Sequence, residues 1–171
     1  VDAVKAMEAN SPHDTPGNEL FYEHVHYRFE GNYILAKTVL DQVKKTLPET
    51  ITQHKKDRPA LTLADCQDRL VFTVYERYQT AQFVLNKLIN NPPFTNQSYH
   101  SDLVAELEHE AERFKQDIPS SREKIQSMYN EQISQHPQDW RLRFKLAYLY
   151  SQDPTKIEHA TLESKKILEY V

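Results

Sequence analysis

The sequence of 171 residues carries a net charge of −4, with both signs interspersed, and only two of its residues are glycine. A nucleic-acid-binding surface needs a concentrated basic field, which this sequence lacks. Phosphate loops and turn-rich β folds need positive-φ positions, so the low glycine content disfavours both, and the glycine-rich nucleotide motifs are absent. No apolar run has membrane-spanning length, and the N-terminal residues lack a signal-peptide pattern. Together with the single cysteine, Cys66, this favours a cytoplasmic location.

In chain order, residues 1–19 predict an irregular lead-in with a short helical turn at 3–9, because prolines interrupt any longer pattern. Apolar residues then recur every three or four positions from 31 to 47, which predicts an amphipathic helix. Pro48 stops that helix or opens a short one, and residues 54–59 are a charged connection.

The middle of the chain predicts two capped helices. Thr62 is a suitable N-cap with Asp65 three residues later, and Thr73 is positioned to cap a second helix that spans about 74–90. The consecutive prolines of NNPPFT, residues 90–95, break this helix.

The C-terminal part predicts four more helices. They span about 101–117, 119–135, 140–151 and from Pro154 to the end, and Pro119 separates the first two. No segment has convincing strand character. We therefore predict an all-α fold of about seven helices, in which short connections place neighbouring helices in antiparallel pairs.

Residues 137–171 resemble a tetratricopeptide repeat. The resemblance rests on Leu146, Ala147 and Tyr150 in the first helix, Ala160 in the second, and Pro137 closing the preceding unit. It implies a right-handed α-solenoid in which small residues let paired helices approach closely. The alternative is a generic helical hairpin, because alignment needs about one extra residue and the preceding pair is degenerate.

A repeat of this kind implies a protein or peptide partner, bound by the first helix of each pair. Arg141, Lys145 and Tyr148 share one face of such a helix, and they are the predicted partner-binding residues. The alternative is a solvated charged face. Phe94 is a further candidate in an exposed-looking loop, although a packing role between helix pairs is favoured for it.

The stretch Glu23-His24-Val25-His26 precedes the first long helix and has three interpretations. His24 and His26 would point to opposite sides of an extended loop, and no further ligands are evident nearby, so a metal site is disfavoured. A structural role at the helix entrance is the second interpretation, with Gly31 allowing close packing. The third interpretation is catalytic.

The segment EHVHYRFEGNYILAKTV resembles the last block of SGNH/GDSL-type hydrolases, in which an acid, two variable residues, a histidine and a glycine precede an amphipathic helix. Glu23, His26 and Gly31 occupy the matching positions. The resemblance implies that His26 is the general base and Glu23 orients it. Glutamate replaces the family's usual aspartate, and the sequence has no Gly-Asp-Ser nucleophile motif.

These observations divide the chain into three parts: residues 1–47, resembling the end of a hydrolase domain, a helical linker region at 48–100, and repeats at 101–171. Within the linker region, residues 61–100 look like segments that join such domains to repeats in bacterial multidomain proteins. We expect a protein-interaction module, non-catalytic as an isolated chain and part of a larger bacterial protein. The alternative is the C-terminal portion of an SGNH-like esterase or acyl-transfer enzyme. No cofactor, metal or nucleic acid is expected.

Overall fold

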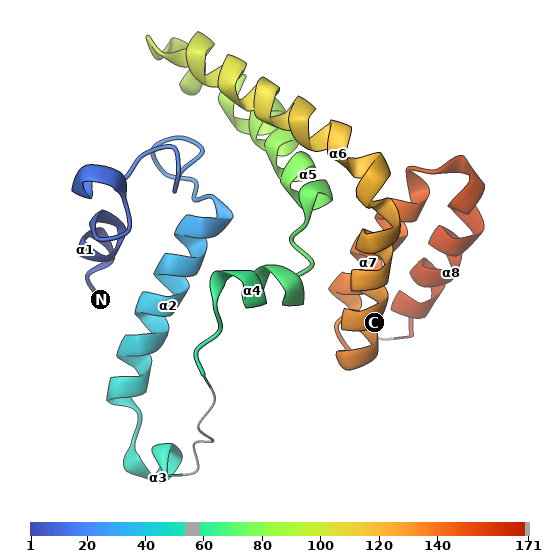
Figure 1. Cartoon of the computed structure of the whole chain (residues 1–171), viewed down its shortest axis with the longest axis horizontal. Coiled ribbons are helices and arrows are strands. Elements are labelled where there is room, and N and C mark those ends of the chain that lie inside the picture. The colour runs from blue at the N-terminus through green and yellow to red at the C-terminus, as the bar shows by residue number, and fades with distance from the viewer. Residues whose placement is uncertain (54–58, 170–171) are drawn as a thin grey trace. The chain divides into compact units, whose positions relative to one another are not determined.

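A computed structural model describes residues 1–53 and 59–169, and these residues form eight α-helices and no extended strand. Figure 1 traces the helices along the chain. The predicted all-α fold is confirmed, with one helix more than the seven expected. None of the described helices is both long and apolar enough to cross a membrane.

The chain divides into two compact units, residues 1–66 and 67–171, and each is described by itself. The division falls within helix α4 (Leu63–Arg69) and coincides with neither predicted boundary, at residue 47 or at residue 100.

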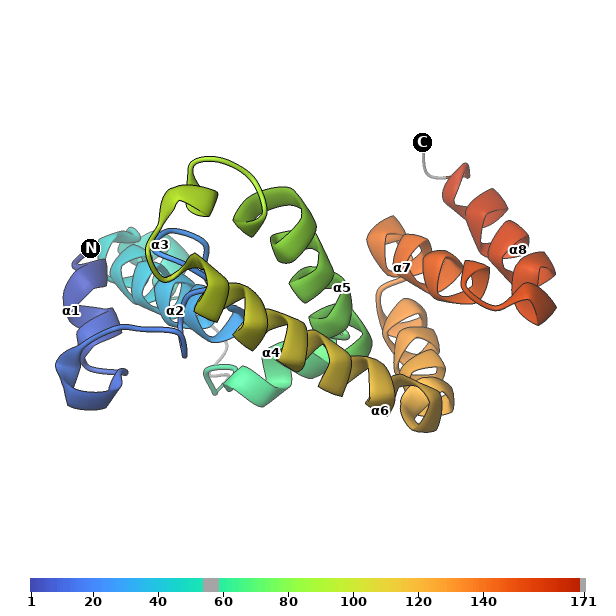
Figure 2. The same cartoon turned by 90° about the horizontal axis from the view of Figure 1, so that it is seen from above.

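The first unit is built on helix α2, Phe29–Thr46, with the short helix α1, Ala3–Glu8, packed beside it (Figure 2). α1 is the helical turn predicted at residues 3–9, and α2 begins two residues before the predicted start. Pro48 opens the short helix α3, Glu49–Thr52. Most of the predicted charged connection lies outside the described residues.

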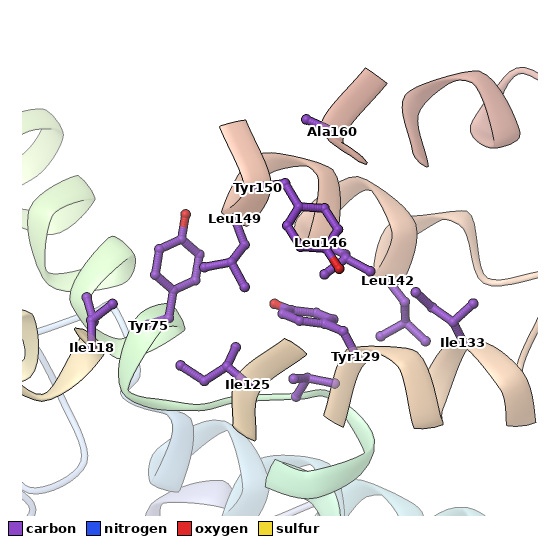
Figure 3. Packing of buried hydrophobic residues seen from close by; sticks show 11 residues of the cluster. Tyr75, Ile118, Ile125, Tyr129, Ile133, Leu142, Leu146, Leu149, Tyr150 and Ala160 are labelled. Atoms are coloured by element: carbon purple, nitrogen blue, oxygen red, sulfur yellow. The ribbon is translucent and has the colours of Figure 1, made fainter. Parts of the chain in front are cut away.

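The second unit has a hydrophobic core cluster to which each of its long helices contributes. Helix α5, Val74–Val84, continues into a π-helical segment, Leu85–Ile89, and packs along α6, His100–Gln135. Helices α7, Trp140–Ser151, and α8, Ile157–Ile167, form a hairpin against the end of α6. Figure 3 shows core side chains of α5, α6 and α7 gathered near Tyr129, with Ala160 of α8 beyond Tyr150.

Tyr129 is fully buried, and its hydroxyl donates a hydrogen bond to the carboxylate of Glu76 on α5. The other carboxylate oxygen of Glu76 accepts the backbone N–H of Thr73, 3.1 Å away, which completes a capping box at the start of α5. Because both oxygens are bonded, the buried acid is satisfied, and it ties the start of α5 to the second half of α6.

The two helices predicted on either side of Pro119 are one continuous helix, α6, so the predicted break at this residue is wrong. Proline removes one backbone hydrogen bond and bends a helix, but neighbouring packing can hold the helix together across it. Here Ile118 and Ile125 are both buried in the shared core. Figure 1 shows α6 changing direction between its two halves.

Candidate functional site

The loop before α2 closes on itself as a small antiparallel turn. Phe21 and Tyr27 form an isolated β-bridge, and their rings contact each other in a tilted arrangement with a centroid distance of 4.8 Å. The N–H of Tyr22 donates to the carbonyl of His26 at 2.9 Å, and the N–H of Arg28 donates to the carbonyl of Leu20 at 2.8 Å. These bonds fold residues 23–26 into the tip of the turn.

Gly31 lets the turn close, because the loop passes directly over the Cα atom of Gly31 in the first turn of α2. A Cβ atom at residue 31 would lie 2.6 Å from the carbonyl oxygen of Leu20 and 2.9 Å from Cδ1 of Tyr27. Gly31 has a negative φ, so the glycine is required for space rather than for backbone conformation. The close packing anticipated for Gly31 is confirmed.

The carboxylate of Glu23 lies at the centre of the turn, and its side chain has no exposed surface. Its oxygens accept the backbone N–H groups of Val25, at 2.9 Å, and of His26, at 2.8 Å. Nδ1 of His26 contacts the same oxygen that accepts its own N–H, and Nδ1 of His24 lies 3.0 Å from the other oxygen. The turn thus holds one buried acid between two imidazoles.

The expectation that His24 and His26 point to opposite sides is wrong, because residues 23–26 turn sharply instead of running extended. Both rings reach the same carboxylate. Within the described ranges, no group of three or more histidine, cysteine or acidic side chains is arranged to hold a metal ion.

Burial of Glu23 opposes its ionisation, but hydrogen bonds from the His26 ring and from the amides of Val25 and His26 outweigh that effect, and the pKa of Glu23 lies below its ordinary value. Glu23 is therefore a carboxylate near neutral pH. An ionised carboxylate on Nδ1 fixes the orientation of the His26 ring and leaves Nε2 as the free ring nitrogen.

The ring of His26 remains accessible from the side away from Glu23. Its side chain is 49% exposed, and within the described chain Nε2 makes no hydrogen bond. A histidine with Nδ1 held by a buried carboxylate and Nε2 open is arranged to accept a proton from a nucleophile. The predicted candidates Glu23 and His26 are thus brought together with this geometry.

A second site lies in the other unit, where α5 and α7 flank an open groove of about 420 Å³. The aromatic groove, as we call it, is lined by Tyr75, Gln79 and Phe83 of α5 and by Phe144, Lys145 and Tyr148 of α7. It therefore contains two of the predicted partner-binding residues, Lys145 and Tyr148.

The other two predicted partner-binding residues do not line the groove. Arg141 is on the first turn of α7, 73% exposed at its side chain, with its guanidinium 5.3 Å from the Trp140 ring. Phe94 is only 9% exposed, in a short 3-10 helix, Phe94–Asn96. This burial fits the favoured packing role of Phe94 rather than a binding loop.

Sequence reasoning missed Phe83, Phe144 and Tyr75. Phe83 falls outside the apolar stripe of its helix. Phe144 follows Arg141 by three positions and therefore shares its face of the helix. Both are thus aromatic residues on otherwise polar faces. That placement was an available signal for a binding surface. Tyr75 had no such signal, because its position in the groove depends on how α5 meets α7.

Comparison with known proteins adds no assignment: no protein-family model matches this chain, and no curated protein or solved structure is significantly similar to it.

Proposed function

We propose that residues 20–31 form the acid–base part of an acyl-ester hydrolase or acyltransferase site of the SGNH/GDSL kind. The observation that carries the proposal is the contact between the buried carboxylate of Glu23 and Nδ1 of His26. In a serine hydrolase the histidine takes the hydroxyl proton of the nucleophile while the acid orients and stabilises the ring. His26 and Glu23 have these roles in the proposal.

The nucleophile and the oxyanion-binding groups come from outside these 171 residues in this proposal. The apolar stripe on the second half of α2 is consistent with this. Val39, Leu40 and Val43 are 40%, 50% and 44% exposed, although they occupy the face that an amphipathic helix normally buries. A catalytic domain would cover this stripe and bring its serine to Nε2 of His26.

The test is hydrolysis of short acyl esters such as p-nitrophenyl acetate by the natural full-length polypeptide. We expect His26→Ala to lower kcat by at least about a thousandfold, and Glu23→Gln by a factor of between about ten and ten thousand. His109→Ala, at an exposed histidine of α6 outside this turn, is the control, and it should retain most of the activity. A full-length polypeptide without esterase activity, or with equal activity after His26→Ala, contradicts the proposal.

The 171-residue chain alone should hydrolyse p-nitrophenyl acetate no faster than background, because no serine hydroxyl in the described residues is hydrogen-bonded to a histidine. Turnover by this chain that disappears in His26→Ala would contradict the assignment of the nucleophile to another part of the polypeptide. It would also place a complete site inside residues 1–171.

A second function is supported by the helical hairpin of the other unit. Ala147 and Ala160 are both nearly buried and line the same hollow between α7 and α8, and Arg143 of α7 pairs with Glu163 of α8 at 2.9 Å. Small residues at paired helices are typical of tetratricopeptide repeats. We propose that α7 and α8 form one such repeat and stack on the end of the continuous helix α6, as part of a right-handed solenoid that binds a peptide or protein partner.

This second function is tested by titrating the ¹⁵N-labelled chain with pooled synthetic peptides and following backbone amide shifts. We expect the shifts to cluster on α5 and α7, where the aromatic groove lies. An absence of shifts, or shifts spread evenly over both units, contradicts a dedicated partner-binding surface.

A further inference from the structure

The aromatic groove exposes three large rings on one small area. Phe83, Phe144 and Tyr148 are 59%, 58% and 45% exposed, although such side chains are normally buried. Single exposed apolar residues are common, whereas a gathered set beside a hollow marks a surface that binds something. The rings supply a place for one apolar side chain of a ligand.

The groove also holds a buried hydrogen-bond donor without a partner. Tyr75 is 5% exposed, and its hydroxyl makes no hydrogen bond within the described chain. Figure 3 shows this hydroxyl turned away from Ile125 and Tyr129 of the core. Burial raises the pKa of Tyr75, so the hydroxyl stays protonated and offers its hydrogen to an acceptor.

The positive charge at the groove favours a ligand that carries a negative charge. Lys145 lines the groove, and among the described residues its ammonium group has no acidic partner. The one acid of the groove, Glu76, already accepts from Tyr129 and Thr73. Arg141, one turn earlier on α7, is already paired with Asp139 at 3.9 Å, so Lys145 is the cation of this face that remains open to a ligand. An acidic group is therefore the complement of the exposed α7 face.

We propose that the aromatic groove binds an extended acidic peptide of a partner protein. An aromatic or leucine side chain of the peptide enters between Phe83, Phe144 and Tyr148. A backbone carbonyl of the peptide accepts from the hydroxyl of Tyr75, and a neighbouring aspartate or glutamate pairs with Lys145. This assignment rests on the proposed partner-binding function and gives the chemistry of the partner.

The probes are two fluorescein-labelled decapeptide pools, each with one central Trp, Phe or Leu, flanked in one pool by Asp and Glu and in the other by Lys and Arg. Fluorescence polarisation with the whole chain measures binding. We expect the acidic pool to bind at least about tenfold more tightly than the basic pool, and Lys145→Glu to reverse this preference.

Two further variants test the other contacts. Tyr75→Phe keeps the shape of the core and removes only the hydroxyl, and it should weaken binding of the acidic pool by about three- to tenfold. Phe144→Ala should weaken it by about tenfold or more. Lys165→Glu and Leu162→Ala, both exposed on α8, are matched controls that should bind like the parent chain.

The outcomes separate this inference from the function on which it rests. Peptide binding that is indifferent to Lys145→Glu, Tyr75→Phe and Phe144→Ala overturns the assignment of the groove and leaves partner binding standing. No binding of either pool overturns both. Concentration-dependent self-association of the chain that Phe144→Ala abolishes overturns the inference as well, since a second copy would then occupy the groove.

Discussion

At the scale of single residues, Glu23 decides how the loop before α2 is held. One buried carboxylate accepts two backbone N–H groups and contacts two imidazoles, so the loop depends on its negative charge. A tight turn built around a charged acceptor is sensitive to protonation, because the neutral acid accepts hydrogen bonds more weakly.

The carboxyl group of Glu23 should titrate below the ordinary glutamate pKa of about 4.3, as measured by its ¹³C chemical shift. Because the pKa is lowered in the folded state, this group stabilises the loop above about pH 4.3, and the stabilisation is lost as the pH falls through the lowered pKa. His26→Ala should move the titration upward. A Glu23 titration at or above the ordinary value would contradict the described hydrogen bonds.

Gly31→Ala should lower the free energy of unfolding of the first unit by about 1–3 kcal/mol, since the added methyl group would overlap the Leu20 carbonyl and the Tyr27 ring. Urea unfolding followed by helix circular dichroism measures the change. Ala36→Gly, in the exposed part of α2, is a control for helix propensity and should cost about 1 kcal/mol. A stabilised Gly31→Ala variant would show that the loop does not close over α2.

At the scale of elements, the sequence predicted the features that depend on neighbouring residues, and it did not predict those that depend on tertiary packing. Thr62 and Thr73 cap their helices as their sequence spacing indicated, because a capping box needs only neighbouring residues. Pro119 misled the prediction, because the packing of Ile118 and Ile125 keeps α6 continuous. The contact of Glu23 with His26 was foreseeable from their spacing, whereas the aromatic groove depends on two helices separated by 55 residues or more.

The hydrogen bond between Tyr129 of α6 and Glu76 of α5 should contribute measurably to the free energy of unfolding. Tyr129→Phe removes the donor to Glu76 in a fully buried position, and we expect it to lower the free energy of unfolding by about 1–3 kcal/mol. Tyr99→Phe is the matched control at a 49% exposed ring, and it should change stability by less than about 0.5 kcal/mol. Equal stabilities of the two variants would argue against the buried hydrogen bond.

At the scale of the whole molecule, the two units differ in how self-sufficient they are. The core cluster of the second unit runs from Val71 to Ala160 and draws on every long helix after residue 70. The first unit has fewer buried side chains and leaves one apolar face of α2 exposed. The sequence predicted the helices of both units, but their division inside α4 depends on which contacts form and has no compositional signal.

A fragment of residues 61–171 should therefore fold alone. It keeps Thr62, whose hydroxyl accepts the N–H of Asp65 at the start of α4, together with the whole core cluster. We expect strongly helical circular dichroism and a single cooperative thermal transition. A fragment without a cooperative transition would mean that the core requires the first unit.

The bend of α6 at Pro119 has a consequence for binding specificity. The two walls of the aromatic groove, α5 and α7, both pack on this one helix, so the angle at Pro119 sets the distance between them. A substitution at Pro119 changes the width of the groove without changing the identity of any residue that lines it. In the proposed complex, a substitution at Pro119 would therefore change the preferred size of the anchor side chain without altering any residue that contacts the peptide.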